Sequence, residues 1–314
     1  QSNFYVPTQG KELNKILSIQ GKKSINIPLG EIKISRKVNS FTVIFRSCTS
    51  VNMLTQNKKR LFDKNKSEYT FRSLNSIIKS LNYSKKTFPK ISFDIVIIDH
   101  NSVSEDLDKM KNLLNKSNIN NSIINLNTNE FTDNIKKINA KNENVTHNQI
   151  SNMCNIHKSL IVAKNQSDDL IYFVEDDYIH LRETFNEMIL SYERISTQLN
   201  KELVLCPIDY PYLYTKIEPS NIFLGSNKHW RRVEETLCTF CTSKILIDKY
   251  WSKFVAMCQF EHYPFEQPLH EIYKLEYCLS PIPSLAIHCT NINSIFGLSP
   301  NVDWKKIWED SKDY

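Results

Sequence analysis

The fold is decided by residues 171–178, Ile171-Tyr172-Phe173-Val174-Glu175-Asp176-Asp177-Tyr178. Four apolar, β-favouring residues run directly into three carboxylates. A buried strand that ends in this much negative charge is costly unless the charge meets a cation or water. Carboxylate oxygens suit a hard divalent metal whose other ligands are substrate phosphate oxygens. The stretch predicts phosphate-linked chemistry, and the alternative is an ordinary strand-to-helix junction capped by Asp177.

The bulk composition is that of a globular protein with a large core. The chain has 314 residues, of which 40% are hydrophobic and 24% are charged. A net charge of +6 with dispersed basic residues favours an anionic substrate or loose contact with an anionic membrane surface, and does not indicate nucleic acid. The densest basic run, residues 57–60 followed by Lys64 and Lys66, is expected to be a solvated loop.

Cysteine usage predicts a reducing compartment. There are 8 Cys, an even number that could form disulfides, but several lie inside apolar, strand-like runs. The chain shows neither a signal peptide nor an apolar run of about 18 residues. We therefore expect free thiols in a cytoplasmic protein that makes at most peripheral contact with the inner face of the membrane.

Strands and helices alternate through the first two thirds of the chain, which predicts βαβ units and a mainly parallel sheet. The expected strands are 41–45, 93–98, 119–126 and 171–174, and the expected helices are 71–81, 106–114, 149–164 and 181–199. The later part differs. It shows short strands at 202–206, 236–241 and 283–288, helices at 245–258 and 266–277, and a Pro- and Tyr-rich loop at 207–214.

Three polar clusters follow three of the predicted strands. They are Arg46-Ser47-Cys48, Asp99-His100-Asn101-Ser102 and Glu175-Asp176-Asp177. Ligands of open α/β sheets bind outside the carboxyl ends of the strands, so the three clusters are expected to form one site. Taken singly, each has a structural alternative, such as an Asx-type turn at Asp99 or a surface charge at Arg46.

This order of features resembles the GT-A family of nucleotide-sugar-dependent glycosyltransferases, most of all its family 2 type. Residues 97–102 resemble that family's apolar strand and Asp-Asp-x-Ser turn, which recognises the nucleoside, with His100 replacing the second Asp. Residues 148–155 resemble the helix start before the metal motif, without its usual Gly and Arg. The Glu-Asp-Asp cluster resembles the Asp-x-Asp motif, whose last Asp binds the metal and whose first contacts ribose or metal.

The resemblance covers residues 41–185 and implies a GT-A (Rossmann-like) α/β fold, with a mainly parallel sheet flanked by helices and an irregular C-terminal acceptor half. The expected division is a loosely packed N-terminal extension at 1–40, a nucleotide-sugar-binding half at 41–185, an acceptor-binding half at 186–290 and a tail at 291–314.

The resemblance also implies the site residues. Contacts to the nucleotide sugar are expected from Arg46, Asp99, Asn101, Glu175, Asp176, Arg231 and Arg232. Mn²⁺ or Mg²⁺ is expected on Asp177, with His288 completing the shell, although His288 could equally be a core histidine. Residues 229–232 are expected to be a flexible loop that supplies cations, and Tyr210, Tyr212 and Trp230 are expected to face the acceptor.

Glu266, at a predicted helix start, is the expected catalytic base if the reaction inverts the anomeric centre. The alternatives are Glu235, Glu261 and Asp209, and a helix-start acid can also be purely structural. A retaining reaction needs no such base, and the sequence leaves the choice open.

The expected partners are a nucleoside diphosphate sugar donor and a glycan or glycolipid acceptor. Two other function classes stay open. A nucleotidyltransferase or other metal-dependent phosphotransfer enzyme usually needs a Gly-rich phosphate loop, and the chain has none. A non-catalytic carbohydrate-binding protein is allowed by the 14 Tyr, 16 Phe and 4 Trp.

Overall fold

A computed structural model describes residues 24–27, 30–50, 59–216, 219–261, 264–312 and 314. At its centre is a sheet of 9 strands in the order β5-β4-β3-β6-β11-β8-β12-β10-β9. These strands are β3 (Ser40–Ser47), β4 (Ser92–Asp99), β5 (Asn120–Asn125), β6 (Leu170–Glu175), β8 (Leu203–Leu205), β9 (Ile222–Leu224), β10 (His229–Val233), β11 (Phe240–Ser243) and β12 (Tyr277–Ile282). Two further strands, β1 (Ser24–Ile27) and β2 (Gly30–Lys33), pair with each other.

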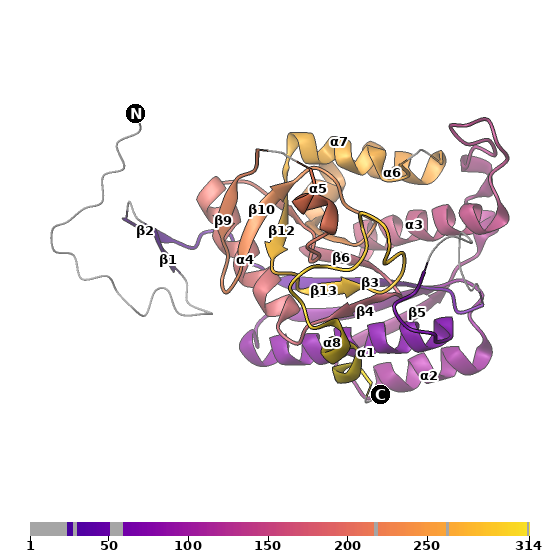
Figure 1. Ribbon diagram of the computed structural model, residues 1–314, viewed down its shortest axis with the longest axis horizontal. Helices are drawn as coiled ribbons and strands as arrows, with labels where there is room; N and C mark the ends of the chain where they lie inside the picture. Colours follow the sequence, from indigo (N-terminus) through magenta and orange to yellow (C-terminus); the bar gives the residue numbers. More distant parts are fainter. Residues whose placement is uncertain (1–23, 28–29, 51–58, 217–218, 262–263, 313) are drawn as a thin grey trace.

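Helices lie on both sides of the sheet (Figure 1). They are α1 (Lys66–Thr87), α2 (Ser104–Asn115), α3 (His147–Gln166), α4 (Thr184–Leu199), α5 (Lys244–Lys249), α6 (Trp251–Gln259), α7 (Gln267–Leu275) and α8 (Trp304–Asp310). Figure 1 shows α1 and α2 on one side, and α3, α6 and α7 on the other. Short 3-10 turns at Thr128–Glu130, Thr132–Asn134 and Pro211–Tyr214 complete the regular structure.

The four predicted strands of the first half are confirmed. Strands β5, β4, β3 and β6 are neighbours and all run parallel. Their apolar side chains are covered on both faces; Phe41, Val43, Ile44 and Phe45 of β3 are each 0% exposed. The α/β class, with a mainly parallel and helix-flanked sheet, therefore follows from the strand composition as expected.

The second half of the sheet is more regular than predicted. The segment 229–232, expected to be a flexible loop, is part of strand β10. The helix expected at 266–277 ends earlier, at Leu275, and β12 begins at Tyr277. The helix expected at 245–258 is divided at Tyr250 into α5 and α6. Strand β10 was not predicted because three of its five residues are basic or His. Strand β12 was not predicted because it contains Pro281, and Pro is normally excluded from the inner strands of a sheet.

A small second sheet joins distant parts of the chain. Strand β7 (Tyr178–His180) pairs antiparallel with β13 (Ala286–His288), and His288 lies opposite Tyr178. The expected strand at 283–288 is thus confirmed in its last three residues. This pairing brings His288 next to the carboxylates that leave β6.

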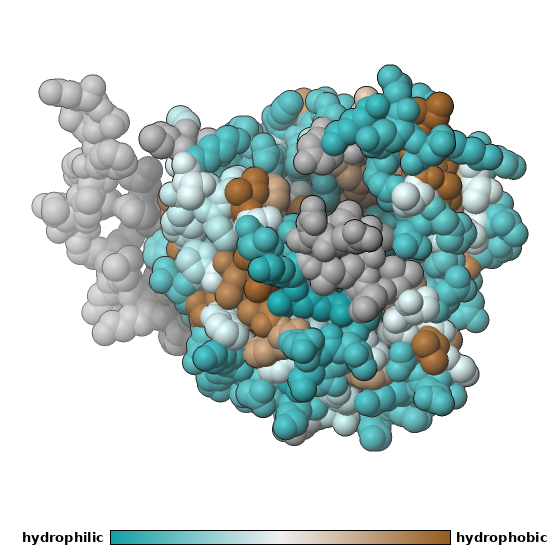
Figure 2. Space-filling view, turned by 45° about the vertical axis from the view of Figure 1, so that its right-hand side comes forward, coloured by the Kyte–Doolittle hydropathy of each residue, from teal (hydrophilic) through white to brown (hydrophobic). Residues whose placement is uncertain are grey.

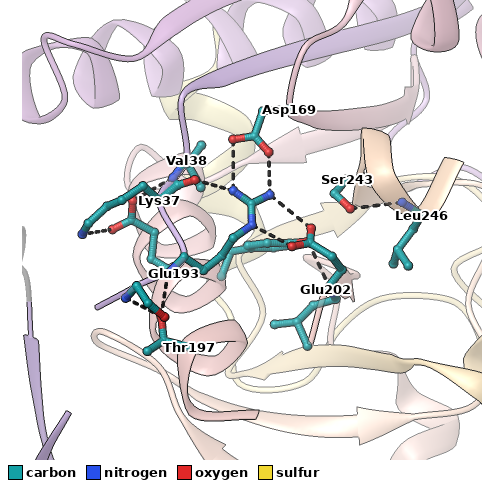
Figure 3. A network of polar contacts seen from close by, with 12 residues as sticks. Lys37, Val38, Asp169, Glu193, Thr197, Glu202, Ser243 and Leu246 are labelled. Atoms are coloured by element: carbon teal, nitrogen blue, oxygen red, sulfur yellow. Dashed lines mark hydrogen bonds and ion pairs between the residues drawn. The ribbon is translucent and has the colours of Figure 1, made fainter. Parts of the chain in front are cut away.

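The end of segment 1–40 is anchored to the domain by Arg36. Its Nε lies 2.7 Å from Glu202 Oε1 and its Nη1 lies 3.2 Å from Asp169 Oδ2. Figure 3 shows Asp169 and Glu202 converging on this guanidinium group, while Glu193 binds the backbone N–H of Val38. Residues 36–38 are therefore part of the packed domain rather than loosely packed.

Arg36→Ala should lower the free energy of unfolding by about 3 kcal/mol, because two largely buried carboxylates lose their cation. Chemical denaturation measures this. The matched control is Lys111→Ala, whose ion pair with Asp108 is exposed on both sides and should change stability by less than about 0.5 kcal/mol. Equal effects of the two substitutions would show that the Arg36 network does not stabilise the fold.

The apolar side chains are gathered mainly inside. The face in Figure 2 is mostly hydrophilic, with smaller hydrophobic areas separated by polar ones. Within the described ranges, no helix combines the length and the apolar character that crossing a membrane requires. All eight cysteines are free thiols, and all but Cys48 are buried.

Candidate functional site

A cavity of about 330 Å³ lies at the carboxyl ends of β3 and β6. The predicted residues Arg46, Glu175, Asp176, Asp177, Glu266 and His288 all line it. Its other polar lining residues include Cys48, Arg60, Lys66, His100, Gln149, Ser151, Asn152, Cys238, Glu261 and Thr290. The Arg-Ser-Cys and Glu-Asp-Asp clusters thus meet at one place, at the sheet edge where parallel strands bind ligands.

Asp177 and His288 face each other in this cavity. His288 Nε2 lies 3.5 Å from Asp177 Oδ2. His288 Nδ1 lies 3.0 Å from the carbonyl oxygen of Phe296 and donates to it, and the ring stacks on Tyr178 at 4.6 Å with a 7° tilt. A backbone acceptor on one ring nitrogen fixes the tautomer and aims the other nitrogen, as is usual for metal-binding histidines.

The charges of the pair reinforce each other. Burial favours the neutral carboxyl of Asp177, but His288 and then Lys66 outweigh it and hold the pKa of Asp177 well below its ordinary value. Burial also favours neutral imidazole, but Asp177 outweighs it and raises the pKa of His288. In the absence of a metal, the two side chains therefore form an ion pair wherever the pH lies below the raised pKa of His288.

A divalent metal fits between these two side chains. Asp177 Oδ1 is buried and has no hydrogen-bond partner in the part of the chain that the structure describes. Carboxylate oxygen and imidazole nitrogen both suit Mn²⁺, and the oxygen suits Mg²⁺. No group of three or more His, Cys, Asp and Glu side chains that could hold a metal occurs among the described residues. Water and phosphate oxygens would therefore complete the shell.

The ion pair predicts a pH dependence of the metal-free protein. Because the pKa of His288 is raised, its stabilising contribution is present below about pH 6.5 and is lost as pH rises through the raised value. Because the pKa of Asp177 is lowered, its contribution is present above about pH 3.9 and is lost as pH falls through the lowered value.

The melting temperature of the metal-free protein should therefore fall from mildly acidic towards alkaline pH, relative to the control His288→Gln, which removes the titrating group. Mn²⁺ affinity should change in the opposite direction and rise with pH, because the metal needs neutral His288. The same dependence of melting temperature on pH in both proteins would contradict the ion pair.

Asp176 and Lys66 form the next pair of charges. Lys66, the first residue of α1, makes an ion pair with Asp176 Oδ1, and Thr70 Oγ1 donates to Asp176 Oδ2 at 2.9 Å. Burial favours the neutral amine, but Asp176 and Asp177 outweigh it and raise the pKa of Lys66. Asp176 thus holds a half-buried cation at the cavity wall, while Asp177 faces His288.

The prediction of a solvated loop around Lys66 is wrong for the two cations that line the cavity. Arg60 reaches the cavity because its backbone pairs with Thr290, and its guanidinium lies 5.4 Å from the centre of the Tyr69 ring. Residues 57 and 58 lie outside the described residues. The cavity therefore has cations from Arg60 and Lys66, and not from Arg231 and Arg232 as predicted.

Arg46 lies at the floor of the cavity. It is only 6% exposed, its Nη2 lies 3.0 Å from Glu175 Oε1, and its Nη1 donates to Asn152 Oδ1 at 3.1 Å. Arg46 and Glu175 are opposite each other on β3 and β6. The register of the parallel sheet thus creates this pair.

Two carboxylates from the later part of the chain face the same space. Glu266 occupies the N-cap position of α7 without a capping hydrogen bond from its side chain, and its Oε1 lies 3.8 Å from Cys238 Sγ. Glu261 accepts a hydrogen bond from Gln149 of α3. The other candidate bases are elsewhere: Asp209 is 1% exposed and paired with Arg231, and Glu235 does not line the cavity.

Asp99 and Asn101 have structural roles rather than cavity contacts. The Asp99 carboxylate is 2% exposed and accepts hydrogen bonds from Ser47 Oγ at 2.6 Å and Ser102 N at 3.1 Å. Asn101 takes the left-handed backbone that the turn requires, with φ 58°. The prediction of direct nucleotide contacts from these two residues is not supported. Their neighbour His100 lines the cavity instead.

The predictions for β10, an acceptor contact from Trp230 and nucleotide-sugar contacts from Arg231 and Arg232, are also corrected. Trp230 is 0% exposed and donates from Nε1 to Glu187 at 3.2 Å, so it cannot stack on a sugar. Arg231 is paired with Asp209, and the Arg232 guanidinium lies 5.0 Å from the centre of the Tyr277 ring. All three support the sheet and do not line the cavity.

Tyr210 and Tyr212 are core residues as well. They are 1% and 3% exposed. The Tyr210 hydroxyl lies 3.1 Å from that of Tyr178, and Tyr212 donates to the carbonyl oxygen of Glu235 at 2.6 Å. Both predicted acceptor contacts are therefore wrong, because the Tyr-rich stretch packs inward.

No protein-family model matches the chain, and no curated protein matches it. Three solved structures are similar. S. aureus TarS has a TM-score of 0.37 and 17% identity, and the match covers 67% of this chain and 48% of that one. For the galactosyltransferase LgtC with donor and acceptor sugar analogs, the TM-score is 0.36, the identity 10% and the coverage 76% of this chain and 72% of that one. For UDP-glucose pyrophosphorylase with UDP-glucose, the TM-score is 0.40, the identity 8% and the coverage 86% of this chain and 96% of that one. The chain spans about half (48%) of the TarS structure. Likeness at this level does not assign an activity, so the functional conclusion depends on the cavity residues.

Proposed function

We propose that the protein is a metal-dependent glycosyltransferase that moves a sugar from a nucleoside diphosphate sugar to a saccharide or lipid-linked acceptor. The observation that supports this most is the Asp177–His288 pair, which leaves a buried carboxylate oxygen unpartnered in a cavity that also holds Arg60 and Lys66. The buried free thiols suit a cytoplasmic enzyme, at most in contact with the inner face of the membrane.

The charge of the cavity supports the need for a metal. Its described lining contains five carboxylates and only three Arg or Lys side chains. A nucleoside diphosphate is itself an anion, and like charges at short range repel strongly in a poorly hydrated site. A divalent cation on Asp177 and His288 would reverse this local balance.

The residues have distinct roles in this proposal. A metal on Asp177 and His288 would act as a Lewis acid on the diphosphate leaving group. Lys66 and Arg60 stabilise the negative charge that develops on the diphosphate as the sugar–phosphate bond breaks. The Asp176–Lys66 ion pair holds that ammonium group in place before substrate arrives.

Glu266 and Glu261 are the two groups placed to take the acceptor hydroxyl proton if the anomeric centre is inverted. Both carboxylates line the cavity, whereas Glu235 and Asp209 do not. Glu266 remains the proposed base because it lies at the start of α7 and lines the cavity, while Glu261 is already bound by Gln149.

A nucleotidyltransferase is the second candidate function, and fewer features of the cavity support it. Such enzymes usually hold a triphosphate with a Gly-rich loop. The chain has 5 Gly, and none is in the described lining of the cavity. A non-catalytic sugar-binding role would not explain the unpartnered Asp177 oxygen or the half-buried cations Arg60 and Lys66 beside it.

The test is thermal stabilisation by nucleoside diphosphates and nucleotide sugars, with Mn²⁺ and with a chelator, followed by an assay of the products. We expect stabilisation only with the metal, and slow release of nucleoside diphosphate. Release of pyrophosphate from a nucleoside triphosphate and a sugar phosphate would establish the nucleotidyltransferase instead. Binding without any turnover would favour the non-catalytic role.

A further inference from the structure

The charges of the cavity are divided into two groups. The first group surrounds Lys66, whose pKa depends on the charges of Asp176, Asp177 and Arg60. It also contains His288, which pairs with Asp177. We call this group the phosphate end. Arg46 and Glu175 form the ion pair of the second group, which adjoins the first at Glu175, because Glu175 also helps to raise the pKa of His288. Both residues lie near Cys238 together with Glu266. Gln149 brings Glu261 to the same wall of α3 that carries Asn152.

This second group, the floor, has more negative than positive side chains. Glu175, Glu261 and Glu266 line it with Arg46 as the one Arg or Lys side chain that the described residues contribute there. Glu261 Oε2 is buried and has no hydrogen-bond partner among the described residues. Arg46 Nη2 is likewise buried without a hydrogen bond from the described part of the chain, although Glu175 is close enough for an ion pair.

Unpartnered buried polar atoms in a cavity point to a ligand that supplies the missing hydrogen bonds. A guanidinium N–H requires an acceptor and a carboxylate oxygen requires a donor. A sugar hydroxyl is both at once, since its oxygen accepts and its O–H donates. A carboxylate on the ligand would satisfy Arg46 but would face three protein carboxylates.

We propose that the floor binds the transferred sugar and selects one without a negative charge, with Arg46 and Asn152 binding its hydroxyl groups. The inference rests on the proposed function, because it assumes that a diphosphate occupies the phosphate end. It assigns the donor to the neutral pyranoses and excludes their uronic acid counterparts.

The experiment uses the full chain and isothermal titration calorimetry with Mn²⁺. The four common nucleoside diphosphates, those of uridine, guanosine, cytidine and thymidine, first identify the base that binds. Nucleotide sugars of that base are then compared in matched pairs that differ only at C6, a hydroxymethyl group against a carboxylate. We expect the neutral member of at least one pair to bind at least about tenfold more tightly than its uronic acid partner.

Two variants test the assigned residues. Glu261→Gln keeps the shape and removes one negative charge, so the discrimination between the pair should shrink severalfold. The control Glu130→Gln removes a carboxylate that is 48% exposed, pairs with Lys158 and does not line the cavity, and the discrimination should be unchanged. Asn152→Ala should weaken the neutral nucleotide sugar and leave the affinity for the bare diphosphate unaltered. Asn152 serves here in place of Arg46, because loss of the buried guanidinium would leave Glu175 unpaired.

The outcomes separate the two proposals. If no diphosphate binds, with or without Mn²⁺, the proposed function fails and the inference fails with it. If a diphosphate binds but each uronic acid conjugate binds as tightly as its neutral partner, the proposed function stands and the inference is overturned. The inference is also overturned if Glu130→Gln changes the discrimination as much as Glu261→Gln.

Discussion

Replacing Asp177 with Asn should weaken metal-dependent binding of a nucleoside diphosphate by more than about 100-fold, with little loss of fold stability at alkaline pH, where His288 is neutral and its ion pair with Asp177 is already lost. The amide keeps the size of the side chain but removes the charge that a divalent metal needs. The unpartnered Oδ1 is the atom most affected. Calorimetry with Mn²⁺ measures the binding, and thermal melting in a chelator measures the fold.

Asp176→Asn is the matched control, because it makes the same chemical change one residue earlier. It leaves Lys66 without its ion-pair partner, and we expect a loss of about 3 kcal/mol in the free energy of unfolding. Metal-dependent binding should persist below the lowered melting temperature. If Asp176→Asn eliminates metal binding and Asp177→Asn does not, the assignment of the metal ligand is wrong.

Glu266→Gln should reduce sugar transfer by about 10²–10⁴-fold while donor affinity and melting temperature stay nearly unchanged. Proton transfer from the acceptor hydroxyl needs a carboxylate, and glutamine cannot accept that proton. Binding of the donor's diphosphate depends on the phosphate end of the cavity, which this substitution does not touch, and the amide keeps the shape of the side chain on the floor. Initial rates of transfer and calorimetry of the donor measure the two effects separately.

Glu261→Gln is the control for this prediction, since Glu261 lines the same cavity. We expect its transfer rate to fall by less than about tenfold. A fall of only a few-fold in Glu266→Gln would return Glu266 to a structural role at the start of α7. If Glu261→Gln then showed the large loss, Glu261 would be the base. Small losses in both variants would favour a retaining reaction.

The first half of the fold could be predicted from sequence because its strands are apolar on both faces. Strand β6 and the middle parts of β3 and β4 are apolar runs, so the type and order of these strands follow from composition and alternation. Strand β10 could not be read in this way. Its Trp230 and Arg231 look like a basic loop until Glu187 and Asp209 supply their partners.

The site residues that could be predicted are polar residues at the end of an apolar strand or directly after it. Arg46, Glu175, Asp176 and Asp177 belong to this class, and they all line the cavity. Lys66 was missed because α1 was expected to start at residue 71. Asn65 followed by Glu68, a helix-start spacing, was the available signal. Arg60 carried no local signal, since its place depends on Thr290.

The pairing of β7 with β13 has a consequence for how the protein matures on the ribosome. Asp177 follows β6, the last of the four parallel strands of the first half. His288 is synthesised much later and reaches Asp177 only when β13 pairs with β7. A nascent chain should therefore complete the proposed metal site in one late step, when β13 pairs with β7. Metal capture would then report completed folding of the newly made enzyme.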